Sequence, residues 1–187
     1  MYDQKQYDPR QREEGLRAVL WGLRALAAIT WPFTRKDVGA FCPGSAALGS
    51  VLLVLAVAVW KDSLAAWALL WLLILGLMRL RAMYFRNVRN GIIPHRYWDG
   101  TPWLAQKLLP RVQNISNLKG YEAFLVAFAG IALTHVDPAV GGLVIASAAA
   151  SFCVEAISVQ IRKNRIGAMR DAQVEMNQLM DDYHHGI

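Results

Sequence analysis

The sequence predicts an all-α integral membrane protein with four transmembrane helices, arranged as two consecutive helical hairpins. Apolar residues make up 55% of the 187-residue chain and charged residues only 18%. The two classes are segregated into long blocks, whereas a soluble core needs them interleaved. Four apolar runs occupy residues 45–60, 64–78, 121–136 and 138–161. Nineteen of the 20 Lys and Arg residues lie outside the short corners that join these runs in pairs.

Residues 1–37 form a predicted cytoplasmic segment that contains one amphipathic helix, over about residues 15–33. Apolar side chains share one face of this helix, and Arg17 and Arg24 lie beside that face. This pattern favours an interfacial helix that lies in the plane of the membrane surface. The alternative is a fifth span, which would place Arg24 near the middle of the bilayer at a cost of at least a few kcal/mol.

The first predicted transmembrane hairpin covers residues 38–78. Its two apolar runs are each about 24 Å long as helices at 1.5 Å per residue, slightly short of the roughly 30 Å hydrocarbon core. Only Lys61, Asp62 and Ser63 separate them. So short a polar corner predicts a tight turn between two helices.

Residues 79–119 form a predicted cytoplasmic loop with eight Lys or Arg residues and a single acid, Asp99. Basic residues interleaved with aromatic residues at a membrane edge predict a segment that lies on lipid headgroups. The candidate contacts with anionic headgroups or with a partner are Arg79, Arg81, Arg86, Arg89, Arg96, Trp98, Trp103 and Lys107.

The second predicted hairpin covers residues 120–161, and its last helix is rich in small residues at four-residue spacing. Such spacing lets helix backbones approach closely, which is how membrane helices associate. We therefore expect this helix to be buried against neighbours. The predicted packing residues are Gly142, Ala146, Ala150, Ser147 and Ser151.

Residues 162–187 have the pattern of a soluble helix with a short heptad-like seam. Apolar residues recur at alternating spacings of three and four, as in a coiled coil or a helix that docks on a partner. The seam residues are Ile166, Met169, Gln173, Met176, Met180 and Tyr183.

The distribution of the basic residues predicts the orientation in the membrane. Seven Lys or Arg residues precede Val38, eight lie in the central loop and four follow Ile161, whereas only Lys61 lies at a hairpin tip. The positive-inside rule then places both termini and the central loop in the cytoplasm, and we expect a bacterial inner membrane.

Two acids inside the apolar runs are the candidate intramembrane polar site. Glu155 lies near the predicted cytoplasmic end of the last span, within reach of Arg79, Arg81 or Arg162. Glu122 enters the third span at the same level. A structural salt bridge or a snorkelling carboxylate is the preferred interpretation for Glu155, and a structural role is preferred for Glu122 as well. The alternative is a pair of facing carboxylates that share a proton.

No catalytic, cofactor-binding or metal-binding motif is present, and no nucleic-acid partner is expected. The favoured hypothesis is a non-enzymatic membrane subunit of a homo- or hetero-oligomeric complex, for example of a secretion or conjugation type. Its basic loop and its C-terminal helix would dock cytoplasmic proteins. The alternatives are a membrane-shaping hairpin protein, and a small channel or proton-coupled transporter that uses Glu122 and Glu155.

Overall fold

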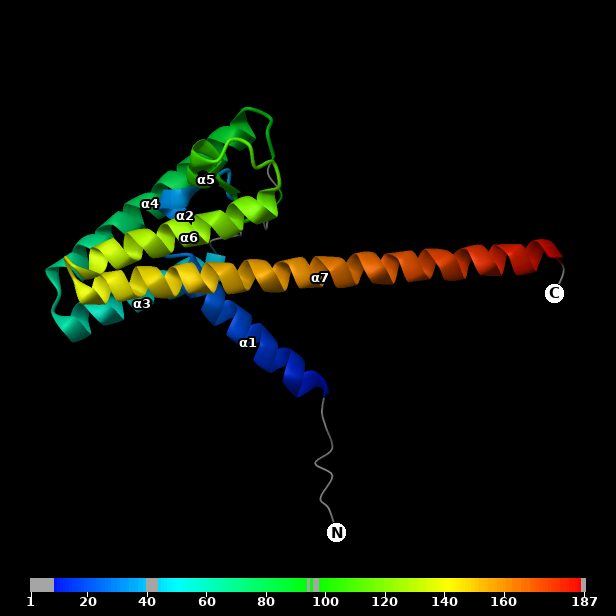
Figure 1. Ribbon diagram of the computed structural model, residues 1–187, viewed down its shortest axis with the longest axis horizontal. Coiled ribbons are helices and arrows are strands. Elements are labelled where there is room, and N and C mark those ends of the chain that lie inside the picture. The colour runs from blue at the N-terminus through cyan, green and yellow to red at the C-terminus, as the bar shows by residue number, and fades with distance from the viewer. Residues whose placement is uncertain (1–8, 40–43, 94, 96–97, 186–187) are drawn as a thin grey trace, which may run out of the picture. The chain divides into compact units, whose positions relative to one another are not determined.

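The computed structural model describes residues 9–39, 44–93, 95 and 98–185, and 82% of the chain is helical (Figure 1). Two compact units meet between Val154 and Glu155, within the last helix. The helices are α1 (Pro9–Ala27), α2 (Trp31–Thr34), α3 (Gly44–Lys61), α4 (Leu64–Arg89), α5 (Trp103–Leu108), α6 (Ile115–Thr134) and α7 (Pro138–His185). Two short strands, β1 (Arg35–Lys36) and β2 (Thr101–Pro102), pair antiparallel.

Three of the described helices are long and apolar enough to cross a membrane, which supports the predicted membrane class. They are α3, α4 and the apolar part of α7. Helix α6, the remaining predicted span, is not in this group. It carries Lys119 and Glu122 near its start, and these charges lower the hydropathy of any long window through it.

Helices α3 and α4 lie side by side and are joined at the predicted corner. Asp62 takes a left-handed conformation with φ of 45°. Ser63 then begins α4, because its hydroxyl accepts a hydrogen bond from the backbone N–H of Ala66 at 3.2 Å. At its other end α4 continues to Arg89, well beyond the predicted apolar run at residues 64–78. The start of the predicted central loop is therefore helical.

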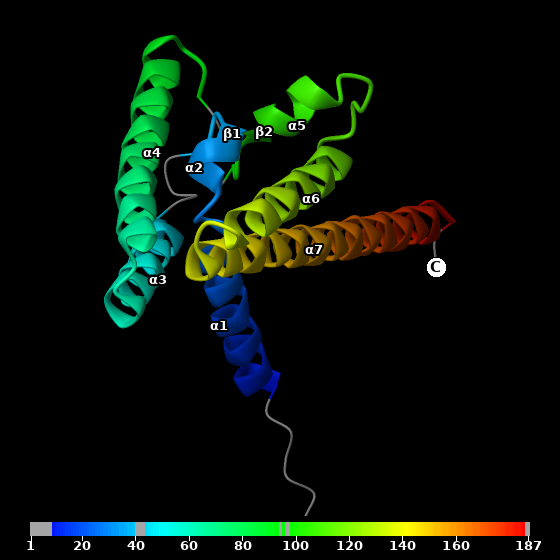
Figure 2. The same ribbon diagram turned by 60° about the vertical axis from the view of Figure 1, so that its left-hand side comes forward.

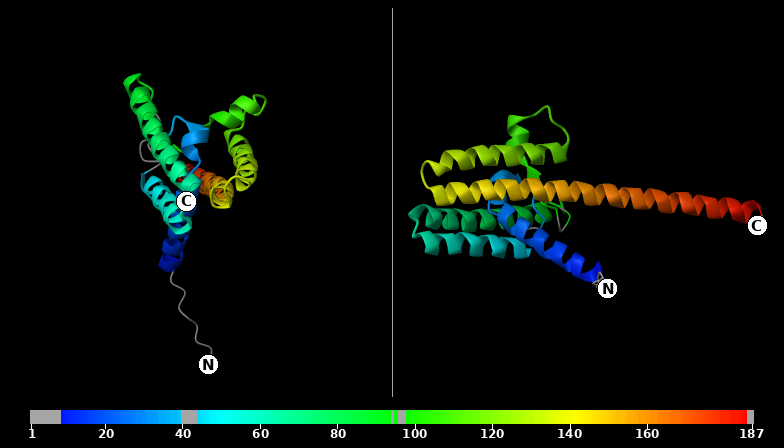
Figure 3. Two further views of the ribbon diagram at one scale, coloured as in Figure 1. Left: turned by 90° about the vertical axis from the view of Figure 1, so that its left-hand side faces the viewer. Right: turned by 60° about the horizontal axis from the view of Figure 1, so that its bottom comes forward.

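The corner between α6 and α7 lies next to the corner between α3 and α4 (Figure 3). Asp137 caps α7 by accepting hydrogen bonds from the backbone N–H groups of Ala139 (2.8 Å) and Val140 (3.1 Å). The Ser63 hydroxyl also donates to the Asp137 carboxylate. The Ser63 bond and then the Val140 N–H hold the pKa of Asp137 below its ordinary value. One carboxylate thus joins the tips of both helix pairs.

The N-terminal segment differs from the single helix predicted over residues 15–33. It divides into α1 and α2, because the Pro32 ring has no N–H to donate and would clash with the carbonyl four residues earlier. Residues 27–32 are buried. Ile29 packs with Val54, Leu70 and Leu73 of the first helix pair. Figure 2 shows α2 between α4 and α6. This end of the segment is part of the core, which a helix lying flat on the headgroups would not be.

Gly76 of α4 lets α2 approach closely, and it gives a first prediction. A Cβ added at Gly76 would lie 2.4 Å from Cβ of Pro32, whose ring is rigid. We expect Gly76→Ala to lower the free energy of unfolding in detergent micelles by about 1–3 kcal/mol, the usual cost of overpacking. Gly120→Ala in α6 is the control, because its Cβ would meet nothing within 4 Å. A helix-interior alanine there should raise stability by up to about 1 kcal/mol. If Gly76→Ala and Gly120→Ala changed the free energy of unfolding equally, the close contact between Gly76 and Pro32 would be contradicted.

The buried face of α7 is rotated relative to the predicted packing row. Ser147, Ala150 and Ser151 are buried as expected, whereas Gly142 and Ala146 are exposed. The residues of α7 that are buried in the first unit form a different row, which begins at Val140 and not at Gly142. That row is Val140, Val144, Ser147, Ala148, Ser151 and Val154.

Candidate functional site

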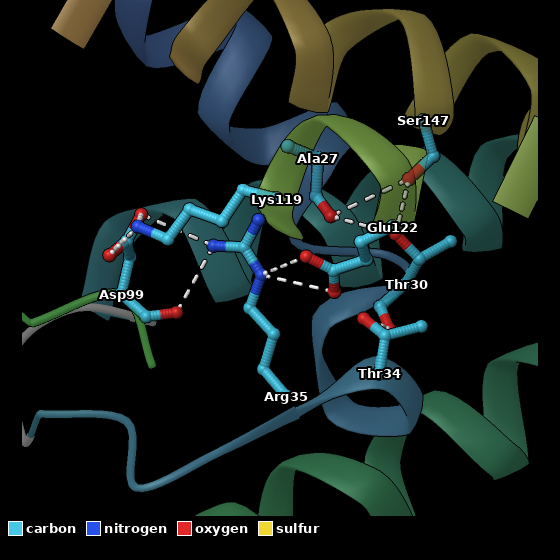
Figure 4. Close-up of polar contacts among 8 residues, drawn as sticks. All are labelled: Ala27, Thr30, Thr34, Arg35, Asp99, Lys119, Glu122 and Ser147. Atoms are coloured by element: carbon cyan, nitrogen blue, oxygen red, sulfur yellow. Dashed lines mark hydrogen bonds and ion pairs between the residues drawn. The ribbon is translucent and has the colours of Figure 1, made fainter. Parts of the chain in front are cut away.

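Four charged side chains from three parts of the chain meet in a buried cluster (Figure 4). Arg35 opens β1, Asp99 precedes β2, and Lys119 and Glu122 lie one turn apart on α6. Pairing of β1 with β2 brings the N-terminal segment and the central loop together. The cluster therefore forms where these two segments contact the second helix pair.

Arg35 is the centre of the cluster. Its Nε atom donates to both carboxylate oxygens of Glu122, at 3.1 and 3.3 Å. Its Nη1 atom donates to the Asp99 backbone carbonyl at 3.1 Å and to Asp99 Oδ2 at 3.2 Å. Lys119 Nζ reaches the two oxygens of the same aspartate at 2.6 and 2.7 Å. The exposed fractions of the Arg35, Lys119 and Glu122 side chains are only 3–4%, and that of Asp99 is 26%.

Two cations and two carboxylates give the cluster a formal charge of zero. Burial of ions is expensive unless each has a close partner and its remaining hydrogen-bonding groups are satisfied. Burial alone would raise the pKa of Asp99, but the Arg35 guanidinium and the Lys119 ammonium together hold that pKa below its ordinary value of 3.8. Asp99 is therefore ionised at neutral pH, as the charge balance requires.

Aromatic rings cover both cations. The Arg35 guanidinium lies 4.7 Å from the ring centroid of Trp31, and Lys119 Nζ lies 5.3 Å from that of Trp98. Cation–π contacts of this kind gain strength when they are desolvated. Trp98, one of the predicted headgroup or partner contacts, is half-buried and its ring lies against the buried Lys119.

A row of hydroxyl groups continues from the cluster toward α7. The hydroxyls of Thr30 and Ser147 are hydrogen bonded at 3.0 Å, and Thr30 also donates to the Ala27 carbonyl at 3.2 Å. Thr34 donates to the Thr30 carbonyl at 3.1 Å. The Ala27 and Thr30 carbonyls also accept hydrogen bonds from backbone N–H groups, so these side-chain bonds reinforce the junction between α1 and α2.

Comparison of the chain with protein-family models, curated proteins and solved structures finds no match. The assignment of a role therefore depends on the geometry alone. The four charged groups are paired with one another. In the described part of the chain, no three His, Cys, Asp or Glu residues are grouped as a metal site would require. The ion pairs of the cluster join the N-terminal segment, the central loop and α6.

The two acids of the predicted intramembrane site have separate cationic partners. Glu122 is bound through both oxygens by Arg35. Glu155 accepts a hydrogen bond from Arg162 Nη2 at 2.8 Å, and Arg162 is one of the three arginines expected to reach it. Each acid therefore forms an ion pair with a different arginine, and the two acids do not share a partner among these contacts.

The other predicted contact residues that the structure describes lie on α4 and α5. Arg79, Arg81, Arg86 and Arg89 are exposed on α4. Trp103 and Lys107 are exposed on α5, and Arg96 lies outside the described residues.

The sequence analysis missed Arg35 and Lys119 as members of a site. One signal was available, because Asp99 is the only acid in a loop with eight cations. A lone carboxylate in such surroundings is a natural centre for an ion-pair cluster.

Proposed function

We propose that this chain is a non-enzymatic integral membrane subunit that packs with copies or other subunits in the bilayer and docks proteins on the cytoplasmic face. The observation that carries the proposal is the apolar outer surface of the helices. Soluble monomers rarely expose apolar patches beyond a few hundred Å², and a lipid environment removes that cost. The large apolar side chains exposed on α3 and on the apolar run of α4 are Leu48, Leu52, Leu53, Val59, Trp60, Leu64, Trp67, Trp71, Leu72, Leu75 and Met78.

Helix α6 is included as a fourth span because its charges do not face outward. Lys119 and Glu122 are buried and are paired with Asp99 and Arg35. Beyond them, α6 exposes Phe124, Phe128 and Ile131. Paired ions inside a bundle are the usual form of charge within a membrane. Two hairpins that cross the bilayer follow from this assignment.

Charge sets the orientation of the proposed hairpins. With nineteen of the 20 basic residues on one side, the positive-inside rule places both termini and the central loop in the cytoplasm. The linked corners at Ser63 and Asp137 then face the other compartment.

Cysteine labelling tests this topology. In a background with Cys42 and Cys153 changed to serine, Lys61→Cys and Val136→Cys should react with a membrane-impermeant maleimide added to intact spheroplasts. Arg111→Cys, in the central loop, should react only after permeabilisation. If the cysteines at the hairpin tips stay unlabelled in intact spheroplasts and react after permeabilisation, both hairpins enter the bilayer from the cytoplasmic leaflet without crossing it. The membrane-shaping alternative requires that result.

Two exposed features of α7 support the proposed association. In the first unit, Gly142, Ala146, Ala149 and Cys153 form an outward row of small side chains at spacings of three and four. Such rows allow close helix packing in a bilayer. In the second unit, the predicted seam is exposed along its whole length. The favoured setting is an inner-membrane assembly of the secretion or conjugation kind.

The channel or transporter alternative receives less support. A proton-carrying carboxylate must exchange its proton within the membrane, whereas Glu122 is held by two hydrogen bonds to a guanidinium. Releasing it would leave a buried arginine with fewer partners, which is costly.

A further inference from the structure

We propose that a basic cleft where α2, α4 and α5 meet binds a phosphoryl anion, and that the source is the headgroup of an anionic phospholipid. The cleft encloses about 550 Å³, within the roughly 300–1,000 Å³ of typical small-molecule sites. The three helices that surround it are visible in Figure 2. Its exposed lining residues are Phe33, Lys36, Arg79, Trp103, Gln106 and Lys107.

The cleft carries an uncompensated positive charge. Lys36 comes from β1, Arg79 from α4 and Lys107 from α5, and no carboxylate lines the cleft. Within the described residues, none of these three side chains forms an ion pair. Arg35 also borders the cleft, but Glu122 and Asp99 neutralise it from behind. Three cations that surround one cleft repel each other, and a bound anion would relieve that repulsion.

The donors suit a phosphate group. The Arg79 guanidinium can present two parallel N–H groups to phosphate oxygens, and the two lysines add point charges. The Trp103 indole and the Gln106 amide are further N–H donors in the lining. No acid competes for these groups inside the cleft, so a phosphate monoester or diester is the class of ligand that fits.

The position of the cleft favours a lipid as the source of the phosphate, and this step depends on the topology proposed above. Arg79 directly follows the apolar run of α4 and so lies at the expected cytoplasmic membrane surface. Phe33 and Met83 add apolar lining beside the cations. Basic pockets between membrane helices on the cytoplasmic side are a known way to hold anionic headgroups.

The test is lipid binding by the purified full-length protein in a nonionic detergent. Short-chain phosphatidylglycerol, short-chain phosphatidylcholine, glycerol 3-phosphate and inorganic phosphate are titrated separately, and binding is followed by thermal unfolding and native mass spectrometry. Phosphatidylglycerol should bind and phosphatidylcholine should not. The variant K36Q/R79Q/K107Q should lose roughly a hundredfold in affinity for phosphatidylglycerol, from three headgroup cations. Its three side chains are exposed, so its fold is checked by circular dichroism.

The matched control is K163Q/R165Q/R170Q, which removes three cations from the C-terminal part of α7. It should keep wild-type affinity. If the two triple variants lost affinity for phosphatidylglycerol equally, the effect would be one of overall charge and the proposed site in the cleft would be wrong. Failure of all four probes to bind would also overturn the proposed site. Glycerol 3-phosphate or inorganic phosphate that binds as tightly as the lipid, with the same sensitivity to K36Q/R79Q/K107Q, would support the phosphoryl site but overturn the lipid source. Because binding is measured in detergent, its failure is distinct from failure of the proposed topology, which the labelling experiment reports.

Discussion

Arg35→Met should lower the free energy of unfolding by about 3–5 kcal/mol, the range measured when one partner of a buried ion pair is removed. The substitution keeps a long side chain in place, so the loss comes mainly from the charge left behind. Glu122, whose side chain is 4% exposed, would lose its guanidinium partner. Asp99 would keep its ion pair with Lys119 but lose the one with Arg35. Denaturation of the purified protein in mild detergent measures the change.

The double variant Arg35→Met/Glu122→Leu separates the pair from the packing around it. An apolar replacement of both partners is often neutral or even stabilising, so the double variant should regain most of the stability that Arg35→Met loses. Arg86→Met is the control for loss of an arginine as such. Arg86 is exposed on α4, and its replacement should change stability by no more than about 0.5 kcal/mol. If Arg35→Met were as mild as Arg86→Met, the cluster would not hold the segments together.

A further variant, Glu122→Gln, distinguishes a structural Glu122 from one that transports protons or ions. A structural acid predicts that Glu122→Gln is destabilised and assembles poorly. A proton or ion site predicts a stable, correctly inserted Glu122→Gln protein with no transport. The two hydrogen bonds from Arg35 Nε favour the structural outcome.

Local patterns predicted the helices well where a single physical signal defines both ends. Helix α3 extends over Gly44–Lys61, against a predicted run of residues 45–60, because a glycine and a charge bound an uncharged apolar block. Helix α4 continues past the end of its apolar run, since loss of apolarity marks the edge of a membrane and not the end of a helix. The N-terminal segment divides into two helices and its second half is buried in the core, which the amphipathic pattern did not indicate. A helical-wheel projection shows which face of a helix is apolar, but it does not show whether that face contacts lipid or protein.

The cluster was not predictable in the same way. Arg35 and Glu122 are 87 residues apart, and Arg35 and Asp99 are 64 apart. No periodicity links such positions, because their meeting depends on how the N-terminal segment enters between the two helix pairs. The basic central loop was therefore assigned to headgroups as a whole. In the structure Lys119 of this loop is buried beside a carboxylate, whereas the arginines on α4 and Lys107 on α5 are exposed.

The variant Met169→Asp/Met176→Asp should abolish association through the C-terminal helix. Both side chains lie on the predicted seam and are highly exposed, at 71% and 62%. A helix gains most of its stability from packing of its apolar face, so a row of exposed apolar side chains favours a partner. Methionine suits an adaptable contact surface because it is flexible and polarisable. Two carboxylates within such a seam would have to be desolvated without partners, which is costly.

The readout is the mass of the detergent-solubilised complex, with its components identified by mass spectrometry. Ala168→Asp/Val174→Asp adds the same charge at exposed apolar positions outside the seam and should leave that mass unchanged. Loss of a second copy of the chain in the seam variant would assign the seam to self-association, and loss of a different protein would assign it to docking. An unchanged complex in the seam variant would contradict both. The C-terminal helix would then contribute nothing to assembly, and the row of small residues on α7 would be the remaining contact surface to test.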